Sequence, residues 1–152
     1  EDIKNLYLIA GPQGGAVTFI LTDAEIKYES FLEAINSMLA TGEIPGLFVK
    51  EDRDLIPLQQ KNVYMKEAGA KGEDPSTAFL WNYFINRCKD NLHTVLCFSP
   101  VSPKFRERSQ KFPSLFSTCA IDWFLPWPEE ALISVSEKFL KEFKIDNNKE
   151  VK

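Results

Sequence analysis

Two apolar runs rich in β-forming residues, joined by a basic segment of helical character, constrain the fold of this chain more than any other feature. The first run lies in Asn91–Pro100 and the second in Cys119–Pro128, and each is closed by a proline. Between them, Lys104–Gln110 has the polar, basic composition of an exposed helix. A helical crossover between two strands lets them run in the same direction. We therefore expect an α/β fold with a parallel sheet.

Continuous apolar and β-branched stretches predict three strands, at Ala16–Thr22, Thr94–Phe98 and Cys119–Phe124. The first is apolar at nearly every position, which is typical of a strand buried on both faces. Helical spacing of apolar residues predicts helices at Asp2–Ala10, from Glu29 to a cap at Gly42, from an Asp74 cap through Pro75 to Asn91, at Lys104–Gln110 and from Pro128 onward. The intervening residues 43–74 carry repeated Pro, Gly and charged residues, and we interpret them as insertions on a core.

Composition limits the class of protein. With 152 residues and 12 phenylalanines the chain can bury a core, and we expect one domain over residues 1–145 followed by a polar tail at 146–152. A net charge of -4 argues against a nucleic-acid surface, and no apolar run reaches the roughly 20 residues needed to span a bilayer. Cys88, Cys97 and Cys119 lack metal-ligand spacing and are expected to be buried free thiols.

Five segments together resemble one known family. They are Phe31–Asn36, Thr41–Phe48, Leu92–Pro100, Lys111–Leu115 and Ile121–Pro128. Spread over nearly the whole chain, they look like the fourth AAA+ module of a dynein heavy-chain motor ring. The phrase Cys-Phe-Ser-Pro within Leu92–Pro100 resembles the axonemal type, because the cytoplasmic relative tends to carry Asn-Pro there.

The resemblance implies a partial AAA+ large subdomain, a P-loop NTPase-like α/β fold with helices flanking a parallel sheet. It also implies a place in a motor that drives microtubule-based movement in the cytoplasm and cytoskeleton, in the axoneme of a cilium or flagellum. The implied partners are neighbouring AAA+ modules of the same heavy chain, microtubules through a downstream stalk, and dynein intermediate and light chains, with no nucleic acid and no membrane. ATP and Mg²⁺ are the cofactors implied for the intact module.

The phosphate-binding loop of such a module is not found in these residues. No G-x-x-x-x-G-K-[ST] pattern occurs, and the glycine-rich segment Gly11–Gly15 lacks a following Lys and precedes a strand, so we interpret it as a turn. The resemblance implies that the segment begins after the loop. We therefore expect it to bind nucleotide weakly or not at all by itself and to be inactive alone.

Candidate catalytic and metal-binding residues lie at the end of the first predicted strand. Alignment on the family's apolar run ending in Asp-Glu places Thr22 at the metal-supporting aspartate and Asp23 at the catalytic glutamate. A shift by one residue makes Asp23 the metal residue and leaves Ala24 in place of the base. Glu25 is a possible substitute for the lost carboxylate. Alternatively, Asp23 and Glu25 merely start the next helix.

The end of the next predicted strand supplies a candidate nucleotide sensor. Ser99 falls where the family places a polar side chain near the γ-phosphate, although a serine there also suits a simple turn. Ser117 and Thr118 stand where the family carries an arginine that reaches a neighbour's nucleotide. Arg106 and Arg108 on the preceding basic helix could reach an adjacent site, or be solvated.

Two functions follow from the resemblance. In the first, the module binds ATP in a regulatory manner with weak or no hydrolysis. In the second, it is a non-catalytic spacer that couples the ring to the microtubule-binding stalk. A free-standing α/β interaction protein is a third reading. Each of the first two requires the strands ending at Asp23 and Ser99 to be parallel neighbours, and predicts an exposed sheet edge in the isolated segment, which would promote association.

Overall fold

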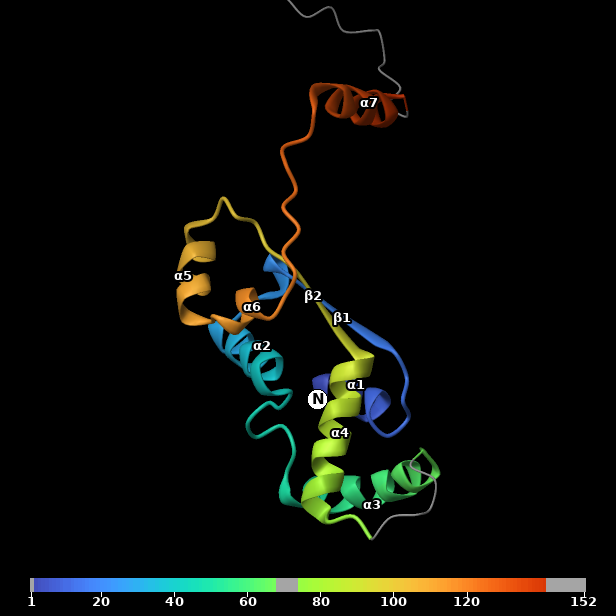
Figure 1. Cartoon of the computed structure of the whole chain (residues 1–152). Helices are drawn as coiled ribbons and strands as arrows, with labels where there is room; N and C mark the ends of the chain where they lie inside the picture. Colours follow the sequence, from blue (N-terminus) through green and yellow to red (C-terminus); the bar gives the residue numbers. More distant parts are fainter. Residues whose placement is uncertain (1, 68–73, 142–152) are drawn as a thin grey trace, which may run out of the picture. The chain divides into compact units, whose positions relative to one another are not determined.

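A computed structural model describes residues 2–67 and 74–141 of the chain. The chain divides into two compact units, Glu1–Ala120 and Ile121–Lys152. The first contains both strands and most of the helices, and the second contains α7 (Glu129–Leu140) (Figure 1). The predicted boundary at residue 145 and the predicted tail lie outside the described residues, so that division stays a prediction.

The sheet of the first unit consists of β1 (Val17–Thr22) and β2 (Leu92–Cys97), which run parallel. The register pairs Val17 with Leu92 at one end and Thr22 with Cys97 at the other. The described part of the long connection between the strands contains one 3₁₀ helix and three α-helices, and a parallel crossover needs a long connection. The prediction that these two segments are parallel neighbours is therefore confirmed.

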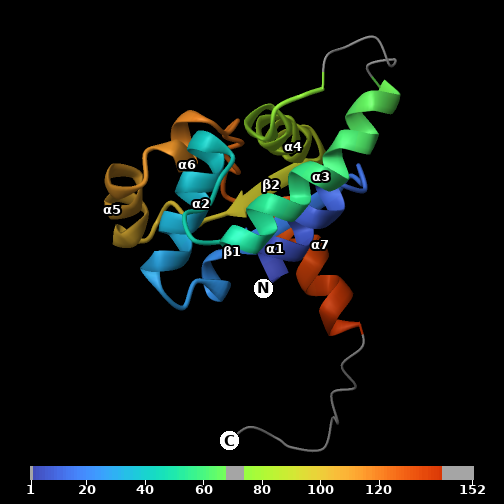
Figure 2. The ribbon, with the colours of Figure 1, turned by 90° about the horizontal axis from the view of Figure 1, so that it is seen from below.

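Helices pack around this pair of strands in two groups. The bounds in chain order are α1 (Asp2–Ala10), the 3₁₀ helix η1 (Asp23–Glu25), α2 (Glu29–Thr41), α3 (Lys50–Glu67), α4 (Thr77–Asn91), α5 (Pro103–Lys111) and α6 (Ser114–Ser117). Two views at right angles place α2, α5 and α6 together near one end of the strands and α1, α3 and α4 together near the other (Figure 1, Figure 2). The helices predicted near residues 2–10, 29–41, 77–91, 103–111 and from 128 are confirmed.

The hydrophobic core lies between α1, α2, α4 and the segment that joins α2 to α3. Phe84 and Leu32 are fully buried in it. The ring of Phe48 contacts Tyr7, Trp81 and Phe84 edge-on, with centroids 5.6, 5.6 and 5.7 Å away. Such pairs add about 0.5–1.5 kcal/mol each beyond the burial of their area. Phe48 thus fastens the α2–α3 connection to the core.

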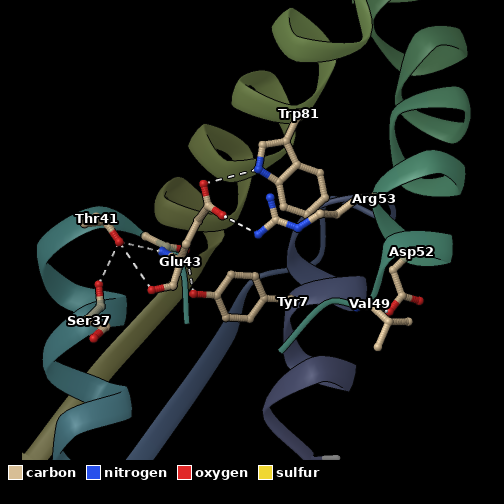
Figure 3. A network of polar contacts seen from close by, with 9 residues as sticks. Tyr7, Ser37, Thr41, Glu43, Val49, Asp52, Arg53 and Trp81 are labelled. Carbon is tan, nitrogen blue, oxygen red and sulfur yellow. Dashed lines mark hydrogen bonds and ion pairs between the residues drawn. The ribbon is translucent and has the colours of Figure 1, made fainter. Parts of the chain in front are cut away.

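Polar contacts reinforce the same connection (Figure 3). Gly42 ends α2 in the left-handed conformation, as predicted, and its carbonyl accepts a 2.7 Å hydrogen bond from the Tyr7 hydroxyl of α1. The Glu43 carboxylate accepts from the Trp81 indole at 3.2 Å and lies 3.4 Å from the Arg53 guanidinium. Arg53 also lies over the Trp81 ring, 4.9 Å from its centroid. One short segment is therefore held by three helices.

Residues 43–74, interpreted as insertions on a core, contain a regular helix that was not predicted, because α3 occupies 18 of them. Two properties concealed this helix. Pro57 lies inside it, and its apolar residues do not form one stripe. Tertiary packing against α4 compensates, for example where the Tyr64 ring contacts Phe79 and Tyr83 edge-on. The predicted cap of α4 is also displaced, since Ser76 and not Asp74 accepts the backbone N–H of Phe79.

The prediction of a third strand at Cys119–Phe124 is wrong. All of these residues are described, and none has strand conformation. A strand is stabilised by hydrogen bonds to a neighbour, and the sheet described here consists of β1 and β2 alone. A composition rich in β-forming residues is therefore not sufficient to make this stretch a strand. The side chain of Phe124 is 94% exposed.

Burial of the strands also differs from expectation. Exposed and shielded residues alternate along both strands, so one face of the sheet, with Ile20 and its register partner Val95, is exposed. The prediction that the first strand is buried on both faces is wrong for this reason. Cys97 lies on the same exposed face, whereas Cys88 is buried and Cys119 is half-buried, so the prediction of three buried thiols is confirmed only for Cys88.

The α7 helix begins after Pro128, as predicted, and its described residues are not buried within its own unit. Its apolar residues Leu132 and Phe139 are exposed. Among the helices described, none is long and apolar enough to cross a membrane.

Candidate functional site

The candidate site lies at the carboxyl ends of the two parallel strands. Asp23 follows β1 directly, and Ser99 follows β2 by two residues. The backbone N–H of Ser99 donates a 2.6 Å hydrogen bond to Oδ2 of Asp23. The structure therefore brings these two predicted site residues together, as the parallel register requires. The contact uses the backbone of Ser99 and leaves its hydroxyl outside this hydrogen bond.

The other oxygen of Asp23 contacts an arginine from α5. Nη1 of Arg108 lies 2.6 Å from Oδ1 of Asp23, and its Nε and Nη2 lie 3.3 and 3.4 Å from Oε1 of Glu29 at the start of α2. The Arg108 side chain is only 8% exposed. A charge removed from water to this degree is stabilised only when it is paired and hydrogen-bonded, and two carboxylates satisfy that requirement here. The network joins the end of β1, α2 and α5.

Glu25 has a different environment from Asp23. The chain leaves the strand at Thr22 and forms η1, so Glu25 does not continue along the strand direction. Its Oε2 accepts a 2.8 Å hydrogen bond from the backbone N–H of Thr22. This carboxylate therefore stabilises the first turn of its own 3₁₀ helix. Thr22, Asp23 and Glu25 lie at one edge of the sheet, but the carboxylates of Asp23 and Glu25 have separate partners.

Sequence reasoning missed Arg108 as the partner of Asp23, and it missed Glu29 as the second carboxylate that Arg108 contacts. Arg108 was expected on a solvated helix face or at an adjacent site, whereas it is buried against its own module. A signal was present: Phe105, Arg108 and Phe112 recur at three- and four-residue spacing and so share one face of α5 and its C-terminal cap. Arg106 lies on the exposed side of the same helix, as a solvated residue would.

A pocket of about 230 Å³ lies apart from these strand ends. The residues that line it are Tyr7, Met38, Leu39, Gly42, Cys88, Lys89, Leu92, Thr94 and Thr118. None of the candidate residues at the strand ends borders it, so we place the site by its side-chain chemistry and not by this hollow. Burial raises the pKa of the Cys88 thiol to about 12 and raises the pKa of Tyr7 above its usual range. Both groups are therefore neutral near pH 7.

The Mg²⁺ assigned to Thr22 and Asp23 can be tested against this geometry. A hard cation needs several oxygen ligands around it. Both oxygens of Asp23 already have donors, and one donor is the cation Arg108. Among the described residues no group of three or more His, Cys, Asp or Glu could hold a metal ion. The described arrangement does not fit Mg²⁺, and the assignment stays a prediction.

Comparison with known proteins gives a consistent result. The family model described as "P-loop containing dynein motor region D4" matches residues 1–152. The chain is 51% identical over 152 residues to the dynein gamma chain, flagellar outer arm, of Chlamydomonas reinhardtii. It is 49% identical over 152 residues to dynein axonemal heavy chain 5 of Rattus norvegicus and 50% over 145 residues to dynein axonemal heavy chain 8 of Mus musculus. These matches cover 95% to 100% of this chain but only 3% to 4% of each relative.

Proposed function

This chain belongs to the family of P-loop containing dynein motor regions D4, and on that premise we propose that it is part of a motor-ring ATPase that drives microtubule-based movement. Its fold class is that of a partial AAA+ α/β domain, with helices flanking parallel strands. The axonemal and flagellar names of its relatives support a place in the ciliary or flagellar axoneme, within the cytoplasm and cytoskeleton. Neighbouring ring modules, microtubules reached through a stalk, and intermediate and light chains are the proposed partners.

The module itself is proposed to bind ATP in a regulatory manner, with weak or no hydrolysis. Ligands of open α/β sheets bind beyond the carboxyl ends of the strands, where Thr22, Asp23 and Ser99 lie. The hydroxyls of Thr22 and Ser99 are of the type that donates to phosphate oxygens. These three residues are the proposed nucleotide contacts, and they act together with a phosphate loop that the D4 family contains.

The state of Asp23 is the observation that carries the proposal of slow hydrolysis. A general base must have an oxygen available to the attacking water. Asp23 instead accepts from Ser99 N–H and from Arg108, and Glu25 accepts from its own turn. Asp23 is also one methylene shorter than the glutamate usual in the family. A misplacement of about 1 Å can reduce the rate about 100-fold. We therefore expect bound ATP to be hydrolysed slowly or not at all at this site.

The test uses the intact heavy chain. A photoreactive ATP analogue, followed by mass spectrometry of the labelled peptides, measures occupancy of this module separately from the others. Recovery of the bound nucleotide after several motor turnovers then shows whether it is still the triphosphate. We expect labelling near residues 22–25 or 98–102, and recovered ATP. The variant Ser99→Ala should weaken labelling severalfold, whereas Ser109→Ala on α5 is the matched control and should not.

Two outcomes would contradict the proposal in different ways. Absence of labelling at this module, with labelling elsewhere in the ring, would favour the spacer that couples the ring to the stalk. Labelling accompanied by complete conversion to ADP within one motor turnover would show that hydrolysis is rapid here. Asp23 or Glu25 would then have a catalytic role that the described contacts do not favour.

A further inference from the structure

The internal partners of Asp23 have a further consequence for the site. A carboxylate at the end of a nucleotide-binding strand ordinarily faces phosphate and metal, yet here it faces a guanidinium from its own module. Arg108 is nearly completely buried, and its side chain contacts Asp23 and Glu29 together. These contacts are made by residues 79 to 85 positions apart in the sequence. The arrangement is therefore a property of the folded site and not of one helix.

We propose that Arg108 is a positioning residue that serves as the built-in counter-cation of Asp23, so that the end of β1 holds its carboxylate without a divalent metal ion. This inference rests on the proposed function, because it concerns the metal requirement of the proposed nucleotide site. The guanidinium stands in for the positive charge that Mg²⁺ would bring. Arg108 thereby fixes Asp23 against the Ser99 amide and keeps it from binding a metal.

Charge and burial support this role. The guanidinium contacts the Asp23 and Glu29 carboxylates and lies over the Phe98 ring, 5.8 Å from its centroid. A divalent cation at Asp23 would lie next to this fixed positive charge in a partly buried place, where repulsion is screened less than in water. Metal binding at Asp23 therefore requires Arg108 to move away. Because Arg108 belongs to α5, the same movement would remove this contact between that helix and the strand end.

Removal of the guanidinium should allow a divalent cation to bind at Asp23. With alanine at position 108, the carboxylates of Asp23 and Glu29 would remain close together without a counter-ion. Carboxylate oxygens are the ligands that Mg²⁺ and Mn²⁺ prefer. We therefore expect Arg108→Ala to create a cation site, whereas Arg108→Lys, which keeps the charge, should not. A purely structural role of Arg108 predicts loss of stability in both variants and a new metal site in neither.

The experiment is a Mn²⁺ titration of the intact, nucleotide-free heavy chain, with free Mn²⁺ measured by electron paramagnetic resonance. Arg108→Ala should bind one additional Mn²⁺ per heavy chain. The wild type should need a Mn²⁺ concentration at least tenfold higher to fill this position. The double variant Arg108→Ala/Asp23→Asn should lose that ion. Arg106→Ala removes an exposed arginine of the same helix and is the matched control, with no added site expected.

An unchanged Mn²⁺ stoichiometry in folded Arg108→Ala would overturn the proposal, as would an equal gain in Arg106→Ala. Should Arg108→Ala fail to fold, Asp23→Asn with Arg108 intact decides: the proposal expects no loss of bound Mn²⁺, and a lost ion refutes it. All arms are measured without nucleotide. Failure of ATP binding would thus refute the proposed function without affecting the Mn²⁺ result. An unchanged Mn²⁺ stoichiometry in Arg108→Ala would refute the role of Arg108 without affecting the ATP-binding result.

Discussion

Replacement of Gly42 by alanine tests how the core is closed at the end of α2. The residue has φ = 84°, a left-handed conformation that costs an alanine about 1–2 kcal/mol. A Cβ atom there would also lie 2.9 Å from Cγ2 of Ile85 and 2.3 Å from Cε of Lys89. Lys89 is exposed and can move aside, but Ile85 is buried and cannot. Overpacking of this kind costs about 1–3 kcal/mol. We expect Gly42→Ala to lower the free energy of unfolding by about 2–5 kcal/mol.

The chain offers a matched control for this substitution. Gly46 has nearly the same backbone conformation, with φ = 76°, but a Cβ atom at this position would meet nothing within 4 Å. Gly46→Ala therefore keeps the backbone cost of about 1–2 kcal/mol and has no steric cost. The difference between the two variants removes the backbone cost that they share and leaves the steric cost at Ile85. Gly42→Ala should also disturb the carbonyl that accepts the Tyr7 hydroxyl, which adds to the difference.

Urea unfolding of the 152-residue chain at low micromolar concentration, followed by near-ultraviolet circular dichroism, measures both free energies. The slopes with urea should agree between variants, so that the midpoints report stability. Equal destabilisation by the two alanines would refute the steric argument. A Gly42→Ala variant within about 0.5 kcal/mol of the wild type would refute the backbone argument as well.

Two further predictions concern the same core. Trp81→Phe removes the indole donor to Glu43 and should cost about 1 kcal/mol or more, whereas Trp127→Phe, at an exposed position, should stay within about 0.5 kcal/mol in the same urea measurement. Because burial raises the pKa of Cys88 from near 9 to about 12, iodoacetamide at pH 8 should modify exposed Cys97 and spare Cys88, as peptide mass spectrometry can show. The raised pKa favours folding fully below about pH 9, and that contribution should decline as the pH rises toward 12; equal labelling of both thiols would contradict the burial.

Local patterns were enough to identify the elements that position the candidate site. The apolar runs at Val17–Thr22 and Leu92–Cys97 are strands, and the resemblance to an AAA+ module predicted that they are parallel neighbours. Gly42 was predicted as a helix cap because few other residues tolerate its conformation. Since carboxyl ends of adjacent parallel strands share one edge, the proximity of Asp23 and Ser99 followed from the same reasoning.

Features that depend on contacts between distant residues were not predictable in this way. The α3 helix contains a proline and has no apolar stripe, so its helical state depends on packing against α4. The stretch Cys119–Phe124 has the composition of a strand, but strand formation needs a partner that the described sheet does not supply.

The sequence alone therefore determined the class of the fold, the positions of its two strands and the edge at which Asp23, Thr22 and Ser99 gather, because each depends on residues near one another in the chain or on the direction of strands. Only the tertiary structure decided what Asp23 contacts. Its pairing with Arg108, 85 positions away, depends on how α5 packs against the strand end. The same local sequence pattern allows a basic residue on a helix to face water or a carboxylate. Which of the two occurs depends on whether ion pairing offsets the cost of desolvation, and that depends on the tertiary contacts.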